Sequence, residues 1–483
     1  MSTKTSTIQG TAWTLTERVS VQLIQFVIGI ILARKLAPEA YGIVGMLGIF
    51  LGIAQICLDC GFGNALIRKK DKTDVDYSTI FIFNLGISLL LYAALYIGAP
   101  LIASFYKIPE LTGITRVISL TIILNALSLV HTAKLTYELN FKLQSVTAII
   151  AVIISGIVGI WMAYHEYGVW ALVGQSICMS LLRTAILWVA SRWKPLLCFS
   201  VSSFKEMFAY GSRLLASGLI HTIYTNLYTI IVGKFFDATS TGYYNRANTY
   251  GLMPNNICDQ VVNKVFFPVL SRQQDDISAL IGTYKKMIKT LMYVYVPFLI
   301  GMAALSSQLL EVLIGPKWLP CAPLLSILCI GYAIAPLTSV NLNLLFVKGR
   351  SDLTLRLDII KKIIGTIILF ASLPFGLWWM CFGKAIYEVV AFSLNSHYTK
   401  KFFGYGAFAQ IKDILPTFIM SASMYALIAF ILRFFHNPWT ELFVGFGTGV
   451  AFYFIISLLT GNESLKDIFG IVSDIKKKKD TTL

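Results

Sequence analysis

Charged residues are scarce in this chain. Only 13% of its 483 residues are Asp, Glu, Lys or Arg, whereas soluble domains carry about 25%. Apolar residues make up 56% of the sequence. This balance excludes a soluble globular protein and favours a chain that lies mostly in lipid.

Acidic residues are fewer than basic ones. The chain has 24 Asp and Glu against 40 Lys and Arg, which gives a net charge of +16. The basic residues are spread over the loops between apolar stretches, whereas a nucleic-acid-binding protein gathers them in one patch. Short loops rich in Lys and Arg mark the cytoplasmic side of a membrane protein. We therefore expect both termini in the cytoplasm and no nucleic-acid partner.

Histidine and cysteine give no sign of a metal or redox centre. The five histidines are isolated, without the spacing of metal ligands. Cys57 and Cys60 form a C-x-x-C pair beside Asp59, but the pair lies within an apolar stretch rather than in a soluble redox fold. We therefore expect no metal, redox role or cofactor.

Apolar stretches long enough to cross a bilayer follow one another along the whole chain. A spanning helix needs about 20 mostly apolar residues, and about fourteen such stretches are present. Glu17, Arg18 and Gln22 lie in the first stretch, which makes it a span rather than a cleavable signal peptide. The sequence predicts an all-α polytopic membrane protein. The expected spans are 10–34, 41–67, 77–105, 115–133, 145–164, 169–190, 207–234, 242–270, 287–310, 320–347, 357–373, 377–398, 415–434 and 440–460.

The sequence contains a faint duplication. Leu32–Leu36 followed by Tyr41-Gly42 resembles Val232–Phe236 followed by Gly242-Tyr243. Because an even number of expected spans separates the copies, the halves would run in the same direction, as in transporters built from parallel repeats. We expect an N-terminal lobe at 1–204, a C-terminal lobe at 205–400, and two further helices with a basic tail at 401–483. The substrate site is expected between the lobes.

Polar stripes mark four of the expected spans, namely 10–34, 41–67, 207–234 and 242–270. Helices that face lipid are uniformly apolar, so these four are expected to line the transport cavity. Basic residues in the cytoplasmic halves of several spans favour an anion, and arginine pairs with phosphate through two donors. Snorkelling to the headgroups or pairing with a carboxylate remains the alternative for each cation. The candidate substrate-binding residues are Arg18, Gln22, Arg183, Arg213, Asn226, Arg246, Asn255, Asn256 and Lys264.

Three carboxylates in the polar stripes are candidates for charge pairing or ion coupling. They are Glu17, Asp59 and Asp259. Polar groups inside a membrane usually have partners, so Asp59 either pairs with Arg18 or takes up H⁺ or Na⁺ during a transport cycle. Both alternatives stay open on the sequence.

Several motifs carry a resemblance to a known family. Asp59–Lys70 resembles the "D-x-GFG-x-ALI-x-RK" segment of polysaccharide exporters. Four further segments fit in register: Leu32–Pro38, Gly242–Ala247, Phe267–Arg272 and Gly315–Trp318. Residues 1 to about 400 are similar to the colanic-acid/teichuronic-acid (WzxC-like) exporter branch of the multidrug/oligosaccharidyl-lipid/polysaccharide flippase superfamily.

The resemblance implies both a fold and an activity. The fold would be a V-shaped pair of six-helix lobes with two additional helices. The activity would be the flipping of undecaprenyl-diphosphate-linked oligosaccharide from the inner to the outer leaflet of a bacterial inner membrane. Glycosyltransferases and a polysaccharide polymerase would be its partners. A monomer suffices, because one chain contains both lobes.

Two alternatives remain. A cation-coupled multidrug exporter of the same superfamily would need carboxylates deep in a lobe, whereas the cationic stripe suits an anion. An integral-membrane glycosyltransferase, polymerase or ligase would need a large outer loop with a catalytic constellation. The expected outer loops stay within ordinary connection lengths, and Asp74-Val75-Asp76 lies in a basic cytoplasmic loop. We therefore expect a transporter and not an enzyme.

Overall fold

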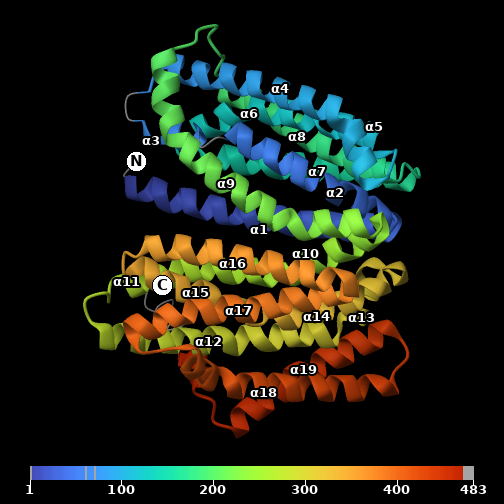
Figure 1. Cartoon of the computed structure of the whole chain (residues 1–483), viewed down its shortest axis with the longest axis vertical. Coiled ribbons are helices and arrows are strands. Elements are labelled where there is room, and N and C mark those ends of the chain that lie inside the picture. Colours follow the sequence, from blue (N-terminus) through green and yellow to red (C-terminus); the bar gives the residue numbers. More distant parts are fainter. Residues whose placement is uncertain (1–2, 60–61, 70–71, 471–483) are drawn as a thin grey trace. The chain divides into compact units, whose positions relative to one another are not determined.

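The computed structural model describes residues 3–59, 62–69 and 72–470, which form helices and no strand (Figure 1). The prediction of an all-α membrane protein is confirmed. Eleven helices in this part of the chain are long and apolar enough to cross a membrane. The three expected spans outside that set are helical but more polar: α1 (Thr3–Lys35), α10 (Ala238–Val261) and α16 (Ser351–Ser372). The count of fourteen therefore stays a prediction.

The chain divides into two compact units, Met1–Asn245 and Arg246–Leu483. After α1, unit 1 contains α2 (Pro38–Asp59), α3 (Phe62–Arg68), α4 (Asp74–Tyr106), α5 (Leu111–Ile118), α6 (Leu120–Tyr137), α7 (Phe141–Tyr164), α8 (Val169–Ser191) and α9 (Val201–Phe235). Within this unit α7 packs on α1 and α8, α6 packs on α4 and α8, and α2 packs on α9. The expected three-part division and V shape stay predictions.

Unit 2 begins within α10. After α10 come a π-helical turn (Val262–Phe266), α11 (Phe267–Ser271), α12 (Ile277–Ala304), α13 (Ser306–Ile314), α14 (Ala322–Tyr332), α15 (Ala335–Val347), α16, α17 (Leu377–Phe403), α18 (Ala407–Ile431) and α19 (Pro438–Leu459). In this unit α17 packs on α14, α15 and α16, while α12 packs on α14 and α18. Short 3₁₀ turns occupy Pro316–Cys321, Leu373–Phe375 and Leu432–Phe434.

The helix boundaries repeat along the chain. α1 ends at Lys35 and α9 at Phe235, while α2 begins at Pro38 and α10 at Ala238, an offset of 200 residues at both boundaries. This offset matches the duplication found in the sequence.

The two copies meet at equivalent glycines inside unit 1. A Cβ on Gly42 would collide with the carbonyl oxygen of Ala238 and lie 3.0 Å from the nitrogen of Gly242. A Cβ on Gly242 would collide with the carbonyl oxygen of Pro38 and lie 3.3 Å from the nitrogen of Gly42. The contact is therefore reciprocal, as in an interface between symmetric copies.

The segment that carries the exporter resemblance includes α3, in which Phe62, Ala65 and Leu66 are buried. Phe62 and Leu66 pack in one cluster with Tyr77, Trp193 and Met207. The polar residues that follow α3 attach this segment to neighbouring helices. The resemblance motif is thus a packing element of unit 1.

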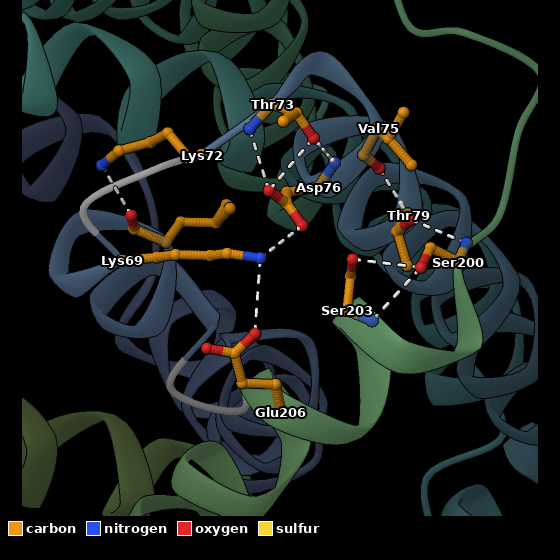
Figure 2. Close-up of polar contacts among 10 residues, drawn as sticks. Lys69, Lys72, Thr73, Val75, Asp76, Thr79, Ser200, Ser203 and Glu206 are labelled. Carbon is orange, nitrogen blue, oxygen red and sulfur yellow. Dashed lines mark hydrogen bonds and ion pairs between the residues drawn. The ribbon is translucent and has the colours of Figure 1, made fainter.

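Figure 2 shows how Lys69 joins three elements. Its Nζ lies 2.8 Å from Asp76 Oδ1 on α4 and 3.3 Å from Glu206 Oε2 on α9. The hydrogen bond to Asp76 raises the pKa of the Lys69 ammonium, against the opposing effect of burial. Asp76 also forms a capping box with Thr73 at the start of α4, and Asp74 accepts a 3.1 Å hydrogen bond from Trp193 Nε1. Both carboxylates of Asp74-Val75-Asp76 therefore have structural partners.

Pro336 lies at a break between two helices. α14 ends at Tyr332 and α15 begins at Ala335, with Pro336 in its first turn, where a missing N–H costs least. α10 and α12 continue through Pro254 and Pro297. The π-helical turn after α10 alters the register of its polar side chains just before α11.

Candidate functional site

One face of α10 carries polar side chains into the interior of unit 2. Asn248, Asn255 and Asp259 are seven and four residues apart, so an unbroken helix places them on the same side. α12, α14, α15 and α17 contribute the side chains that they contact. Two hydrogen-bonded clusters result.

The first cluster surrounds the side-chain oxygen of Asn248. It accepts a 2.7 Å hydrogen bond from the Tyr332 hydroxyl on α14 and a 2.8 Å hydrogen bond from Lys384 Nζ on α17. Lys384 Nζ also lies 5.4 Å from the centroid of the Tyr332 ring. Gly251 permits this approach, because a Cβ there would lie 3.3 Å from ring carbons of Tyr332. An ammonium group inside the unit is thus held by an amide and an aromatic ring.

The second cluster surrounds Asp259. Its carboxylate accepts a 2.6 Å hydrogen bond from Ser339 Oγ on α15 and a 3.4 Å hydrogen bond from Asn255 Nδ2. Asn255 Oδ1 in turn accepts a 3.3 Å hydrogen bond from the Tyr295 hydroxyl on α12. This cluster therefore joins α10, α12 and α15.

Further charges lie on α16 and α17. Lys361 is 6% exposed, and its Nζ lies 2.8 Å from Asp358 Oδ1. Glu388 follows Lys384 by one helical turn and interacts electrostatically with Lys384, Lys361 and Asp259. Charges within membrane-spanning helices are costly and mark functional sites by default. Unit 2 therefore contains a charged interior that could bind or exchange a small ion.

The residues predicted on α10 have different surroundings. Asn255 and Asp259 belong to the second cluster described above. The Arg246 guanidinium is half-buried, 5.6 Å from the ring centroid of Tyr250 and 5.5 Å from that of Trp318. Asn256 and Lys264 are exposed, and no carboxylate in the described part of the chain pairs with Lys264. Pairing of Lys264 with a carboxylate, one of the two alternatives to its predicted role in substrate binding, is therefore not seen there, and its role in substrate binding stays a prediction.

The predicted residues of unit 1 do not form one cluster within the described structure. Glu17 accepts a 3.0 Å hydrogen bond from Ser145 Oγ, and Asn226 donates a 2.9 Å hydrogen bond to the carbonyl of Thr222. Gln22, Asp59 and Arg183 are exposed. No described carboxylate pairs with Arg183.

The side chains of Arg18 and Arg213 lie outside the described structure. Cys60 also lies outside it. The pairing of Asp59 with Arg18, and the roles of both arginines, therefore stay predictions.

Sequence reasoning missed the residues that complete the clusters. The strongest overlooked signal was Lys384 and Glu388, a cation and a carboxylate four residues apart within the expected span 377–398. Such a pair shares one helix face and is unusual within a bilayer. Tyr295, Tyr332 and Ser339 gave no comparable signal, because single hydroxyl groups are common in apolar helices.

Known proteins resemble this chain along most of its length. Residues 31–323 match the model of the family described as "Polysaccharide biosynthesis protein". The chain is 28% identical to the teichuronic acid biosynthesis protein TuaB of Bacillus subtilis (strain 168), covering 88% of each chain. It is 24% identical to the lipopolysaccharide biosynthesis protein WzxC of Escherichia coli (strain K12), covering 75% of this chain and 74% of the relative. It is 22% identical to the succinoglycan biosynthesis transport protein ExoT of Rhizobium meliloti (strain 1021), covering 95% and 94%.

Solved structures share the fold. The lipid II flippase MurJ in its inward closed conformation superposes with a TM-score of 0.76 at 16% identity, covering 94% of this chain and 98% of MurJ. An inward-facing MATE transporter of the MOP superfamily gives 0.58 at 16% identity, covering 80% and 94%. The family match confirms the predicted resemblance to polysaccharide biosynthesis proteins. The prediction of a transporter rather than an enzyme agrees with the names of ExoT, MurJ and the MATE protein. The chain belongs to the polysaccharide biosynthesis protein family and is a multi-pass membrane protein.

Proposed function

We propose that this protein flips a lipid-linked oligosaccharide across a bacterial inner membrane by alternating access. The carrier lipid in this proposal is undecaprenyl diphosphate, and transport runs from the inner to the outer leaflet. The observation that carries the proposal is the amide- and charge-lined face of α10 within a bundle of apolar helices. Membership of a polysaccharide biosynthesis family supports it.

The chemistry of the substrate fits the distribution of polar groups. The polyprenyl tail stays in lipid, while the sugars need amide and hydroxyl partners within the protein. Asn226, Asn255 and Asn256 supply such groups, and sugars commonly bind where amides and aromatic faces meet. The diphosphate needs cations, for which Arg18 and Arg213 remain the proposed partners.

The relatives are named for teichuronic acid, lipopolysaccharide and succinoglycan biosynthesis. A repeat unit of a cell-surface polysaccharide or lipopolysaccharide is therefore the proposed cargo. Glycosyltransferases that build the lipid-linked unit would act before this protein, and a polymerase after it. In the same proposal the protein works as a monomer with both termini in the cytoplasm.

A cation-coupled multidrug exporter is the second candidate. Asp259 and Glu388 favour it, because such an exporter needs carboxylates within a unit. Lys361 and Lys384 lie among these carboxylates and offset their charge, which disfavours the binding of a cationic drug. The flippase proposal therefore accounts for more of the observed charges.

Reconstitution tests the two candidates directly. The full chain is placed in liposomes that carry a short undecaprenyl-diphosphate-linked oligosaccharide in the outer leaflet. Loss of sugar accessibility to a membrane-impermeant oxidant reports flipping, and protein-free liposomes are the control. We expect accelerated loss only with protein. Efflux of ethidium without movement of the oligosaccharide would replace the proposal with the drug exporter.

A further inference from the structure

Glu388 is a carboxyl group inside unit 2 to which the flippase proposal assigns no role. It lies on α17 within a membrane-spanning helix and is only partly exposed. It makes no hydrogen bond or ion pair to any residue that the structure describes. An ionised carboxylate without a partner is strongly disfavoured in such surroundings, so this arrangement suits a carboxyl group that holds a proton.

Lys384 lies one helical turn before Glu388 on the same face of α17. Its ammonium group donates to Asn248 Oδ1 at 2.8 Å, an oxygen that also accepts from the Tyr332 hydroxyl at 2.7 Å. Lys384 thus fastens α17 to α10 beside α14. A lysine side chain is long enough to turn along its helix and pair with a carboxylate four residues away.

We propose that Glu388 and Lys384 form a proton-operated latch on α10. With a proton on Glu388, the lysine stays on Asn248, as observed. When Glu388 releases its proton to water, its carboxylate attracts the Lys384 ammonium, and the hydrogen bond to Asn248 is lost. Only the O–H bond of the Glu388 carboxyl group breaks, and water accepts the proton. The ligand that this site binds and releases is therefore a proton.

The other charged groups near Glu388 do not decide its state alone. Lys361 on α16 favours the ionised form but is held by Asp358 at 2.8 Å. Asp259 on α10 opposes ionisation and is held by Ser339 at 2.6 Å. In the described structure α15 and α18 add no charge that acts on Glu388.

The other titratable side chains around Glu388 are tyrosines and cysteines, which carry no positive charge in either protonation state. On α14 these are Tyr332 and Cys329, on α12 Tyr295, and on α17 itself Cys381, which acts on Lys384. Lys384 is therefore the cation whose position can follow the charge of Glu388.

The latch controls the helix that carries the candidate substrate residues. Asn248 lies on α10 between Arg246 and the pair Asn255 and Asp259. Releasing Asn248 loosens this helix while leaving the second cluster in place. Protonation of one carboxyl group on α17 would in this way change how firmly α10 is held, which is what a proton-driven transport step needs.

Hydrogen–deuterium exchange tests the latch without any substrate. The full-length protein and its Glu388→Gln variant, a permanent mimic of the protonated form, are compared in nanodiscs at pH 5.5 and again at pH 9. We expect equal exchange in the α10 peptide at pH 5.5. At pH 9 the natural protein should exchange about tenfold faster than the variant, the factor that loss of one charge-assisted hydrogen bond supplies.

Comparison at one pH removes the intrinsic pH dependence of exchange. Glu463→Gln is the matched control, because Glu463 is an 83% exposed carboxylate of the same unit, and it should follow the natural protein at both pH values. Equal exchange of the natural protein and Glu388→Gln at pH 9 would overturn the latch. A difference of the same size at both pH values would also overturn it, because it indicates a structural effect of the substitution.

A second variant covers failure of Glu388→Gln to fold. Lys384→Met removes the moving cation, so we expect fast exchange of α10 at both pH values. A variant that keeps the pH dependence of the natural protein would contradict the proposal. Because no substrate enters either experiment, failure of the latch leaves the flippase proposal standing, and failure of flipping leaves the latch testable.

Discussion

At the scale of single residues, Asn341 shows how a polar side chain organises unit 2. It is fully buried, and its oxygen accepts hydrogen bonds from Tyr284 at 3.0 Å, Thr399 at 2.6 Å and Gln410 at 2.9 Å. Its amide nitrogen donates to Gln410 and to the carbonyl of Leu337. The sequence shows only an asparagine in an apolar stretch, because its side-chain partners lie 57 to 69 residues away. Polar contacts at such separations leave no local pattern.

Asn341→Leu should destabilise the protein severely. Three donors would lose their common acceptor, and each buried unsatisfied group costs about 1–3 kcal/mol. Unfolding of the purified protein in mixed detergent would measure the loss. Asn256→Leu is the control, since Asn256 is exposed and its replacement should leave stability near normal. Equal stability of the two variants would mean that the network around Asn341 contributes little.

Arg18→Ala and Arg213→Ala should each reduce polysaccharide export while the amount of protein in the membrane stays near normal. The reason is that a cation in a hydrated cavity contributes to substrate binding more than to folding. Arg18→Lys should restore part of the export, because lysine keeps the charge but loses the two-donor geometry. Surface polysaccharide and immunoblots measure the two quantities. Normal export in both alanine variants would favour snorkelling arginines.

At the scale of elements, apolar length located the helices but not their interruptions. The expected span 115–133 is divided between α5 and α6, and 242–270 contains a π-helical turn between α10 and α11. Hydropathy averages over a window and has no signal for such breaks. Proline is no reliable signal either, because Pro336 lies at a break whereas α10 and α12 continue through Pro254 and Pro297. The candidate site could be predicted only in part, because a pattern within one helix is visible in the sequence and contacts between helices are not. The face of α10 was visible as a row of amides, and its partners on α12, α14 and α15 were not.

Gly42→Ala and Gly242→Ala should both weaken the packing of α2 against the start of α10. The added methyl group would meet backbone atoms, which cannot rotate away, and such overpacking costs about 1–3 kcal/mol. Thermal unfolding of the purified protein measures the effect. Gly98→Ala on α4 is the matched control, because a Cβ there meets nothing within 4 Å. Unfolding temperatures that are equal in all three variants would contradict a tight contact.

Lys69→Gln should detach α3 from α4 and destabilise unit 1 by about 1–3 kcal/mol, because the buried Asp76 loses a charged donor. The folded pKa of Lys69 is raised, so its contribution is fully present below the unfolded value of about 10.4 and is lost as the pH rises through the folded value. The difference in unfolding midpoint between the natural protein and Lys69→Gln should therefore be constant from pH 6 to 9 and shrink at higher pH. A difference that shrinks on the acid side of pH 9 would contradict this assignment.

At the scale of the whole molecule, the contacts of unit 2 agree with the expected number of passes. Lys286 Nζ near the start of α12 lies 2.7 Å from Asp467 Oδ1 in the segment after α19. These two segments therefore lie at the same end of unit 2, as an even number of crossings between them requires. The side of the membrane that this end faces follows only from the Lys and Arg bias of the loops and stays a prediction.

Cysteine labelling on intact cells decides the orientation. After removal of accessible native thiols, a cysteine at Lys317 should react with a membrane-impermeant reagent, and a cysteine at Lys286 should react only after the cells are opened. Lys107 and Lys142 provide a second external and cytoplasmic pair in unit 1. Labelling at position 286 but not at 317 on intact cells would invert the whole topology.

The reciprocal contact between Gly42 and Gly242 has a consequence for how this sequence can change over generations. Because Gly42 has no side chain, the backbone around Gly242 can pack against it, and the same holds for Gly242 and the backbone around Gly42. The two halves of a duplicated chain are otherwise free to drift apart, but at this point a substitution in one copy is opposed by the other. In a library of random variants the two positions should therefore share one pattern of tolerated residues, although they lie 200 positions apart.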